Sequence, residues 1–420
     1  MKPFTSTISI DEARRRLDDA VRAIERTERV PLDQAGGRVA ATEVASEVDV
    51  PPFARAAMDG YAVLAADTAG ASKESPVRLR VAARVFTGEM TTAGAGGGDC
   101  IEIATGAPLP SGADAVVMVE ETRKTGETSP DELIEIMVVA HAGQHVGRRG
   151  ADIAPGDRVV AAGDWLTPSR VGALAAIGRA TVEVFAKPRV AILSTGNEVV
   201  EPGQPLPPGH IFDVNRFTLG AVIAAHGGLA TPHRPAHDSL DALVRALDEC
   251  AGADMIVFSG GSSVGDRDLI ADAIAKRGEM IFHGIAVRPG KPTAFARVYP
   301  SRGPSATVPG KPHGTPFFGM PGNPTSCLSN AYILLVPFLR AMARLPPHRP
   351  RVVRAPLGRR IASVVGRHQF YTVRVRDGVA LPSFKGSGDI TSLSQADGYI
   401  EIPATENVVE EGTVVEVTLF

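Results

Sequence analysis

The stretch from Met255 to Asp268 limits the possible folds of this chain more than any other segment. An apolar run, Met255 to Phe258, is followed by a loop of serine and glycine, and a helical pattern begins near Asp266. This succession is typical of a buried strand, a glycine loop and a helix N-terminus. Small residues let backbone N–H groups approach a ligand, and the helix dipole favours an anion there. The simpler alternative is a tight turn whose glycines only relieve backbone strain, with Asp266 as a helix cap.

The same pattern recurs at three further places. A short apolar run, residues 189–193, ends in the polar loop Ser194 to Glu198. Residues 287–292 place two cations beside a rigid proline turn, and residues 319–326 lead into an apolar helix for which Asn323 is the predicted N-cap. Loops at the carboxyl ends of strands in an open α/β sheet converge on one crevice. We therefore expect these loops to face one phosphate-bearing ligand.

Residues 181–344 alternate between strand-like and helix-like segments. The predicted elements are strand 189–193, helix 215–226 capped by Asn215, helix 239–250, strand 255–258, helix 267–276, strands 293–298 and 315–319, and helix 326–343. This alternation predicts a central α/β domain with a mostly parallel sheet and right-handed crossovers.

The flanking segments differ in character. Residues 46–149 carry short β-rich runs between turns of Gly, Ser and Pro, which predicts an inserted β-rich domain. Helices predicted over 9–25 and 168–177 assign residues 1–45 plus 150–180 to one N-terminal helical domain, a candidate for dimerisation. Residues 345–420 begin with a proline linker and continue as strands, which predicts a barrel-like β domain.

The composition narrows the class of protein. The 420 residues are 44% hydrophobic and 22% charged, which suits a globular protein with several cores. The formal net charge of −3 argues against a nucleic-acid binder, which usually has a basic excess. The 3 cysteines lack CxxC spacing, so neither a zinc knuckle nor a disulfide framework is indicated. No segment approaches the ~20 apolar residues of a membrane span, so we expect a soluble, cytoplasmic protein.

Seven short motifs carry a resemblance to a known family. In chain order they are MDGYA at 58–62, ATGAPLP at 104–110, GRRGAD at 147–152, STGNE at 194–198, SGGSSVGDRD at 259–268, RPGKP at 288–292 and MPGNPTS at 320–326. Each motif is weak alone, but in this order the set resembles the molybdopterin molybdenumtransferases, the MoeA family, which is similar to the C-terminal domain of gephyrin. The resemblance implies a homodimer. It also implies a central domain like that of molybdopterin adenylyltransferases, joined by three further domains.

The resemblance implies an enzyme that inserts molybdenum from molybdate into adenylylated molybdopterin. The products would be molybdenum cofactor and AMP, and Mg²⁺ would assist. Molybdopterin adenylyltransferase and molybdoenzyme-maturation proteins would be its partners. Two other functions stay open from the residues alone, an adenylyltransferase-like enzyme and a non-catalytic cofactor-binding scaffold. Tungstate in place of molybdate is a variant of the first.

The family match also assigns roles to single residues. The catalytic set is Asp59, Thr105, Glu198, Asp238 and Asp268. Of these, Asp59, Glu198 and Asp268 are the implied Mg²⁺ ligands, because hard carboxylate oxygens suit that ion. Four of the five catalytic candidates have a simpler alternative: Asp59 as a turn residue before Gly60, Thr105 as a cap of its turn, Glu198 as a solvated side chain, and Asp238 as the N-cap of helix 239–250. The MDGYA and TGAP loops are expected to reach the crevice of the other subunit.

The implied substrate-binding residues come from five segments of the chain. They are Ser259, Gly260, Gly261 and Ser262 of the glycine loop, Arg288 and Lys291 of the proline turn, Pro321, Gly322 and Asn323, and Arg367 and Ser387 near the C-terminus. This chain departs from the family pattern at three positions. Asn197 stands where Asp is usual, Asp266 where Glu is usual, and Arg288 where Lys is usual. Arg presents a planar fork instead of a point charge, so the last change is not equivalent.

Overall fold

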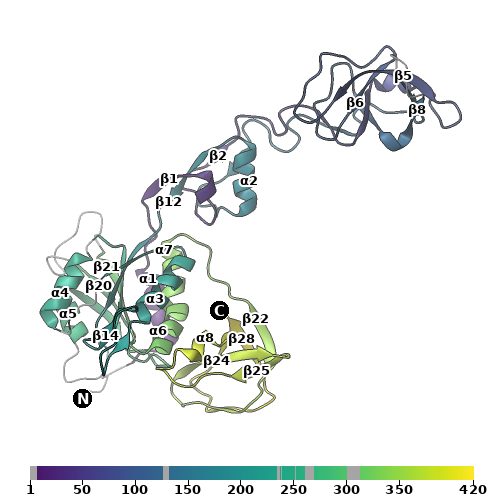
Figure 1. Ribbon diagram of the computed structural model, residues 1–420. Helices are drawn as coiled ribbons and strands as arrows, with labels where there is room; N and C mark the ends of the chain where they lie inside the picture. Colours follow the sequence, from purple (N-terminus) through teal and green to yellow (C-terminus); the bar gives the residue numbers. More distant parts are fainter. Residues whose placement is uncertain are drawn as a thin grey trace. The chain divides into compact units, whose positions relative to one another are not determined.

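The computed structural model describes residues 7–125, 132–233, 237, 239–250, 252–260, 269–299 and 313–420. They form two compact units (Figure 1). The smaller unit consists of Arg29–Gly36 and Ala40–Val184, and the larger of Met1–Glu28, Gly37–Val39 and Phe185–Phe420. Within the described ranges, no helix is both long and apolar enough to cross a bilayer.

A six-stranded sheet with the order β16-β13-β17-β21-β20-β18 organises the larger unit. Its strands are β13 (Arg189–Ser194), β16 (Leu229–Pro232), β17 (Met255–Ser259), β18 (Gly278–His283), β20 (Ala294–Val298) and β21 (Thr315–Met320). The first four in the order pair in parallel, whereas β20 pairs antiparallel with both of its neighbours. The predicted mostly parallel sheet is therefore confirmed.

Helices cover both faces of this sheet (Figure 1). On one side lie α4 (Leu240–Glu249) and α5 (Leu269–Arg277). On the other lie α1 (Ile10–Ala20), α3 (Asn215–Ala225), α6 (Pro324–Asn330), the π-helical turn η4 (Ala331–Leu335) and α7 (Val336–Met342). Successive side chains of a strand point to opposite faces, so β13 serves both cores. Val190 and Ile192 join one core, and Ala191 and Leu193 join the other.

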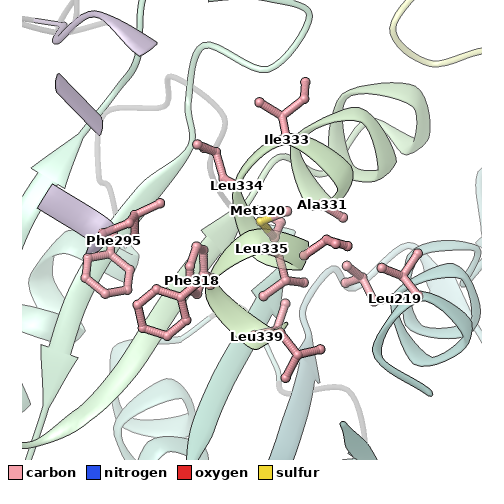
Figure 2. Close-up of a cluster of buried hydrophobic side chains, with 14 of the residues drawn as sticks. Leu219, Phe295, Phe318, Met320, Ala331, Ile333, Leu334, Leu335 and Leu339 are labelled. Carbon is pink, nitrogen blue, oxygen red and sulfur yellow. The ribbon is translucent and has the colours of Figure 1, made fainter. Parts of the chain in front are cut away.

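The larger core is assembled from elements far apart in sequence. Figure 2 shows Leu219 of α3 and Phe318 of β21 around Leu335 and Leu339 of the C-terminal helical segment. All four side chains are fully buried. This packing fixes the helical segment 324–342 against the central sheet. The first residues of that segment line the cavity described below.

One helix end and two helix caps differ clearly from the sequence prediction. The first helix ends at Ala20 and not at residue 25, because Val21 turns to an extended conformation and its N–H closes on Leu17. Helix α3 starts at Asn215, but the cap position is Val214 and Asn215 makes no capping bond. The Asn215 amide is instead used in two long-range contacts described below. For α4, Ser239 is the cap, accepting from the Ala242 amide.

A second six-member sheet closes the C-terminal part of the larger unit. Its order is β19-β24-β26-β28-β22, with β25 paired to β24. The strands are β19 (Val287–Arg288), β22 (Val352–Pro356), β24 (His368–Arg376), β25 (Val379–Pro382), β26 (Gly398–Ile402) and β28 (Val414–Leu419). The strand pair β23 (Ile361–Ala362) and β27 (Val408–Val409) and the short helix α8 (Thr391–Ser394) accompany them. Since β19 precedes β20 of the central sheet, this pairing ties the two sheets together.

The smaller unit contains a β-rich domain, as predicted for the insertion. Its sheet has the order β7-β4-β6-β5-β9-β8. The strands are β4 (Gly60–Val63), β5 (Val77–Val85), β6 (Asp99–Ile103), β7 (Ala115–Met118), β8 (Thr122–Thr125) and β9 (Leu133–Ile136). The MDGYA motif was expected to lie in a loop. That expectation is wrong for its second half, because Gly60 opens the interior strand β4 and Tyr61 is buried.

The remaining elements are short. They are β1 (Thr27–Pro31) paired with β12 (Thr181–Phe185), β2 (Val44–Ala45) with β11 (Arg158–Val160), β3 (Arg55–Ala56) with β10 (Val146–Gly147), β14 (Val199–Val200) with β15 (Ile211–Phe212), helix α2 (Pro168–Ala176), and the 3₁₀ turns η1 (Leu32–Gln34), η2 (Ala65–Thr68) and η3 (Val119–Glu121). The helices predicted for one N-terminal domain lie in two units, since α1 packs into the core of the larger one. The apolar face of α1 packs in the core that covers the central sheet, whereas α2 packs in a separate small core with β1, β11 and β12.

Candidate functional site

A cavity of about 1120 Å³ opens in the larger unit where β13, β17 and β21 end. Its wall comes from seven segments of the chain. The lining residues used below are Glu198, Asp213, Asn215, Ser259, Gly260, Arg288, Lys291, Pro321, Gly322, Asn323, Arg367, Lys385 and Ser387. The predicted convergence of loops at the carboxyl ends of the strands is therefore confirmed for the described residues.

The glycine loop leaves β17 at the base of the cavity. Gly260 has φ +122, and a Cβ there would lie 2.4 Å from the Thr195 carbonyl oxygen. The neighbouring strands close on each other here, because the Thr195 amide donates to the Ser259 carbonyl at 3.1 Å. Only a glycine fits this backbone and this space. The rest of the loop, with the predicted residues Gly261, Ser262, Asp266 and Asp268, lies outside the described residues, as does Asp238.

Asn215 joins three of the loops from below. Its Nδ2 donates to Ser259 Oγ at 2.7 Å and to the Gly322 carbonyl at 2.8 Å. The side chain is 8% exposed, and its Oδ1 has no hydrogen-bond partner among the described residues. The sequence analysis treated this residue as a helix cap only. Its burial beside a polar loop was not readable from sequence, because both partners lie far along the chain.

Two cations stand on the proline turn that follows β18. Arg288 is exposed, Lys291 is half-buried, and both line the cavity. The turn is anchored to the C-terminal sheet, since Val287 and Arg288 pair in parallel with His368 and Gln369. This pairing brings Arg367, which precedes β24, to the same wall. The three cations predicted from two separate motifs thus share one cavity.

The 321–323 loop contacts the 386–389 loop, and both line the cavity. Asn323 occupies the N-cap position of α6, as predicted, but makes no capping bond. Its Nδ2 instead donates to Ser387 Oγ at 2.9 Å, and the Thr325 amide donates to the Ser387 carbonyl at 3.1 Å. Lys385 lines the same wall, and its Nζ donates to Thr391 Oγ1. Sequence reasoning missed Lys385, although its position two residues before Ser387 was a usable signal.

Carboxylates reach the cavity from the STGNE loop and from the start of α3. Glu198 is exposed and lines the opening, whereas Asn197, the position where the family usually has Asp, does not line it. Asp213 is 5% exposed, and its Oδ1 accepts from the Arg216 amide at 3.0 Å. Among the described residues no cluster of three His, Cys, Asp or Glu could hold a metal ion by itself. An ion bound here would take further ligands, such as water or substrate oxygens.

Asp59 and Thr105 belong to the smaller unit, whereas the cavity belongs to the larger one. One oxygen of Asp59, Oδ1, accepts from the Thr105 amide at 2.7 Å and from Thr105 Oγ1 at 2.9 Å. These two bonds favour the carboxylate, the amide bond more than the hydroxyl bond, and hold the pKa of Asp59 below its ordinary value. Asp59 and Thr105, which were predicted separately, are therefore in contact with each other and join the MDGYA and TGAP motifs.

The cysteines are unsuited to nucleophilic chemistry. Burial raises the pKa of Cys100, Cys250 and Cys327 to about 12 in each case. A thiol with such a pKa is almost entirely protonated near neutral pH and is a poor nucleophile. Cys250 Sγ lies 3.7 Å from His233 Nε2, but its raised pKa keeps this thiol protonated.

Three family models match the chain in order. The MoeA N-terminal region (domain I and II) covers residues 8–178, a probable molybdopterin binding domain covers 191–341, and the MoeA C-terminal region (domain IV) covers 354–420. The fold and the cavity therefore define a multidomain α/β enzyme built around a domain of the molybdopterin-binding type. More particularly, the chain belongs to the MoeA family of molybdopterin molybdenumtransferases, transferases of molybdenum cofactor biosynthesis.

Relatives of known name cover the whole chain. A molybdopterin molybdenumtransferase 2 of Mycobacterium tuberculosis is 34% identical over 97% of this chain and 98% of its own. A molybdopterin molybdenumtransferase of Haemophilus influenzae is 29% identical, with 98% of both chains covered. Two crystal structures of molybdopterin biosynthesis MoeA proteins from Pyrococcus horikoshii superpose with TM-scores of 0.80 and 0.78, at 38% and 29% identity. They cover 99% of this chain and 99% and 100% of their own.

Proposed function

We propose that this protein transfers molybdenum from molybdate into adenylylated molybdopterin, releasing AMP and molybdenum cofactor. The observation that carries the proposal is that two features line the same cavity. They are the strand end at Ser259 and Gly260, and the cations of the proline turn and the C-terminal sheet. The names of full-length relatives support the same reaction.

The phosphate end of the substrate is assigned to the base of the cavity. Ser259 and Gly260 end β17 there, and the proposed cradle continues into Gly261 and Ser262. Pro321, Gly322 and Asn323 form the facing rim. Gly260 carries no side chain, so the backbone at this strand end stays open to an oxyanion in the cavity.

Molybdate is assigned to the cationic wall. Arg288, Lys291 and Arg367 supply positive charge, and Ser387 supplies a hydroxyl. A tetrahedral dianion gains charge-assisted hydrogen bonds from such donors, and these are stronger than neutral ones. Because Arg288 brings a planar fork, this site would hold two oxyanion oxygens at once where a Lys would hold one.

Mg²⁺ is assigned to the carboxylates. Glu198 is an exposed oxygen donor at the cavity mouth, which fits an ion that shares substrate phosphates and keeps several waters. When bound, the ion would neutralise charge on the phosphoanhydride as it breaks. Asp268, Asp238, Asp59 and Thr105 complete the proposed catalytic set. We further propose a homodimer in which Asp59 and Thr105 serve the cavity of the partner subunit, to be tested by sedimentation and by mixing inactive variants.

The first experiment incubates the purified protein with adenylylated molybdopterin, Mg²⁺ and molybdate, and follows AMP release and active cofactor together. Molybdate-dependent AMP release with active cofactor is the expected result. Adenylylation of molybdopterin with ATP would instead favour the adenylyltransferase alternative. Binding without turnover would favour a scaffold. Repeating the assay with tungstate tests oxyanion choice, and cell fractionation tests the expected cytoplasmic location.

A matched pair of lysine variants tests the anion site. Lys291→Met removes a cation from the cavity wall and is expected to raise the KM for molybdate. Lys276→Met removes an exposed cation of α5 that does not line the cavity, and is expected to leave that KM unchanged. Equal KM values for both variants and the parent would contradict the assignment of Lys291 to the molybdate site.

A further inference from the structure

A closed ring of hydrogen bonds lies directly beneath the cationic turn. Thr293 Oγ1 donates to the Gly290 carbonyl at 2.8 Å. Asn330 Nδ2 donates to the same carbonyl at 3.0 Å and to Thr293 Oγ1 at 2.6 Å. Both side chains are fully buried, and neither lines the cavity. They cannot touch a ligand, but they satisfy both lone pairs of one carbonyl in the turn that carries Arg288 and Lys291.

The turn has no freedom to move toward this ring. Gly290 adopts φ +105, and a Cβ there would lie 2.0 Å from Asn330 Nδ2. The backbone of Gly290 therefore packs so closely against the Asn330 side chain that only glycine fits. On its other side the Ile285 amide donates to the Lys291 carbonyl at 2.9 Å. The backbone between the two cations is thus held from two directions.

Asn330 is a costly residue for a purely packing role. Its Oδ1 is buried without a hydrogen-bond partner among the described residues. An apolar side chain of similar size would avoid that cost, because replacing polar partners by apolar groups can be nearly neutral. What an apolar residue could not supply is the pair of donated bonds to the turn.

The same helix also holds a second segment of the cavity lining. At its start, α6 binds the Ser387 loop through Asn323 and Thr325. At its end, Asn330 binds the cationic turn, and the helix widens at once into the π turn η4. Inserted π turns occur often at functional sites. One short rigid element therefore sets the spacing between the cations and the serine hydroxyl.

We propose that Thr293 and Asn330 are positioning residues that set the geometry of the oxyanion site. The inference rests on the proposed molybdate assignment and deepens it. The pair determines where the Arg288 and Lys291 donors converge relative to Ser387, and so how tightly a tetrahedral oxyanion is held. Loss of the ring frees the Gly290 carbonyl and lets the turn relax, which separates the donors without removing any charge.

Thr293→Val tests this directly, because it keeps the shape of the side chain and removes the hydroxyl. Thr293→Ser is the matched control, since it keeps the hydroxyl and loses a methyl group. We expect Thr293→Val to raise the KM for molybdate about tenfold, the lower end of the loss caused by removing a supporting partner from a ligand site. The KM for adenylylated molybdopterin should stay unchanged, and Thr293→Ser should retain the molybdate KM of the parent.

Thermal unfolding of each variant separates positioning from stability. A lower melting temperature with an unchanged molybdate KM would overturn the proposal. Asn330→Ser is a second variant, which serves as the test if Thr293→Val does not fold. It should also raise the KM for molybdate. An effect of Lys291→Met without an effect of either ring variant would refute the positioning role and leave the proposed function intact. No effect of Lys291→Met would refute the molybdate assignment itself.

Discussion

Thr105 binds a single oxygen of Asp59 twice, through its amide at 2.7 Å and its hydroxyl at 2.9 Å. The two residues are 46 positions apart, and each belongs to a motif that the sequence analysis had assigned to catalysis. Both bonds favour the ionised carboxylate. Asp59 and Thr105 thus form one hydrogen-bonded pair, in which the Asp59 carboxylate is held in its negatively charged form.

Thr105→Val should raise the pKa of Asp59 but leave it below the ordinary value. The hydroxyl bond is lost, whereas the amide bond, which has the larger effect, remains. Because the folded pKa is lowered, these bonds stabilise the protein above the unfolded pKa, and that contribution is lost as the pH falls through the folded value. A carboxyl NMR titration measures the change. Thr105→Ser should keep the parent value, and an identical titration for the Val variant would contradict the assignment.

Asp254→Asn should destabilise the larger unit by roughly 1–3 kcal/mol, the usual effect of weakening a buried charged hydrogen bond. The Asp254 side chain is 8% exposed, and it accepts from Arg26 at 2.9 and 3.1 Å and from the Arg189 amide at 2.8 Å. Burial by itself would raise the pKa of Asp254, but these bonds outweigh it and the net pKa is lowered.

Urea unfolding at several pH values tests the Asp254 prediction. The stabilisation should be present near neutral pH and should fade as the pH drops below about 4, the ordinary value for Asp. The Asn variant should lack that part of the acid sensitivity. Asp18→Asn on the exposed face of α1 is the control and should behave like the parent.

Gly260→Ala should be destabilising, whereas Gly322→Ala should be tolerated by the fold. The first needs a Cβ at φ +122 and 2.4 Å from the Thr195 carbonyl oxygen. The second places its Cβ 3.6 Å from the Gly260 Cα, an ordinary contact. We expect a cost of roughly 1–3 kcal/mol for the first, as for other strained backbone positions. Equal melting temperatures for the two variants would show that the glycine loop can shift.

His226 should make the protein less stable in mild acid. Its burial, and then the neighbouring His348 and Arg340, lower its pKa to about 4. The rings of His226 and His348 lie 5.0 Å apart, edge to face. Because the folded pKa is below the unfolded one of about 6.5, protons favour the unfolded state. Stability should therefore fall as the pH drops from about 6.5 toward 4.

His226→Phe keeps an aromatic ring at this position and removes the titration. Its melting temperature should change less with pH over that window than that of the parent. His141→Gln removes an exposed histidine and should keep the pH dependence of the parent. A parallel pH dependence in parent and His226→Phe would assign the effect to other groups.

Where the sequence predicted the fold correctly, the signal was local. The run at 189–193 became β13, and the run at 255–258 became β17, each extended by one serine. Apolar continuity reports burial on both faces of a sheet, and burial is what these strands have in common. The loops between them could be assigned to one crevice because parallel strands end at the same edge.

The failures have a common physical cause. Asn215 and Asn323 stand at helix starts, where Asn usually caps, yet their amides donate to residues 44 and 64 positions away. Gly60 resembles a turn residue but opens the strand β4. Glycine is needed there for close packing, because a Cβ would lie 1.9 Å from the Val117 carbonyl oxygen. Local preference is worth about 1 kcal/mol at such positions, and a buried long-range bond or close packing overrides it.

The sequence by itself determined the alternation of strands and helices, the order of the motifs and hence the family. These follow from periodicity and from short residue patterns, which a chain carries regardless of its partners. Only the tertiary structure decided which loops share the cavity wall, that Asn215 joins three of them, and that Thr293 and Asn330 lie beneath the cationic turn. Those relations depend on side chains that meet only in the folded sheet. A buried polar group forms its hydrogen bonds with whichever partners the fold places near it, and these partners are far away in the sequence.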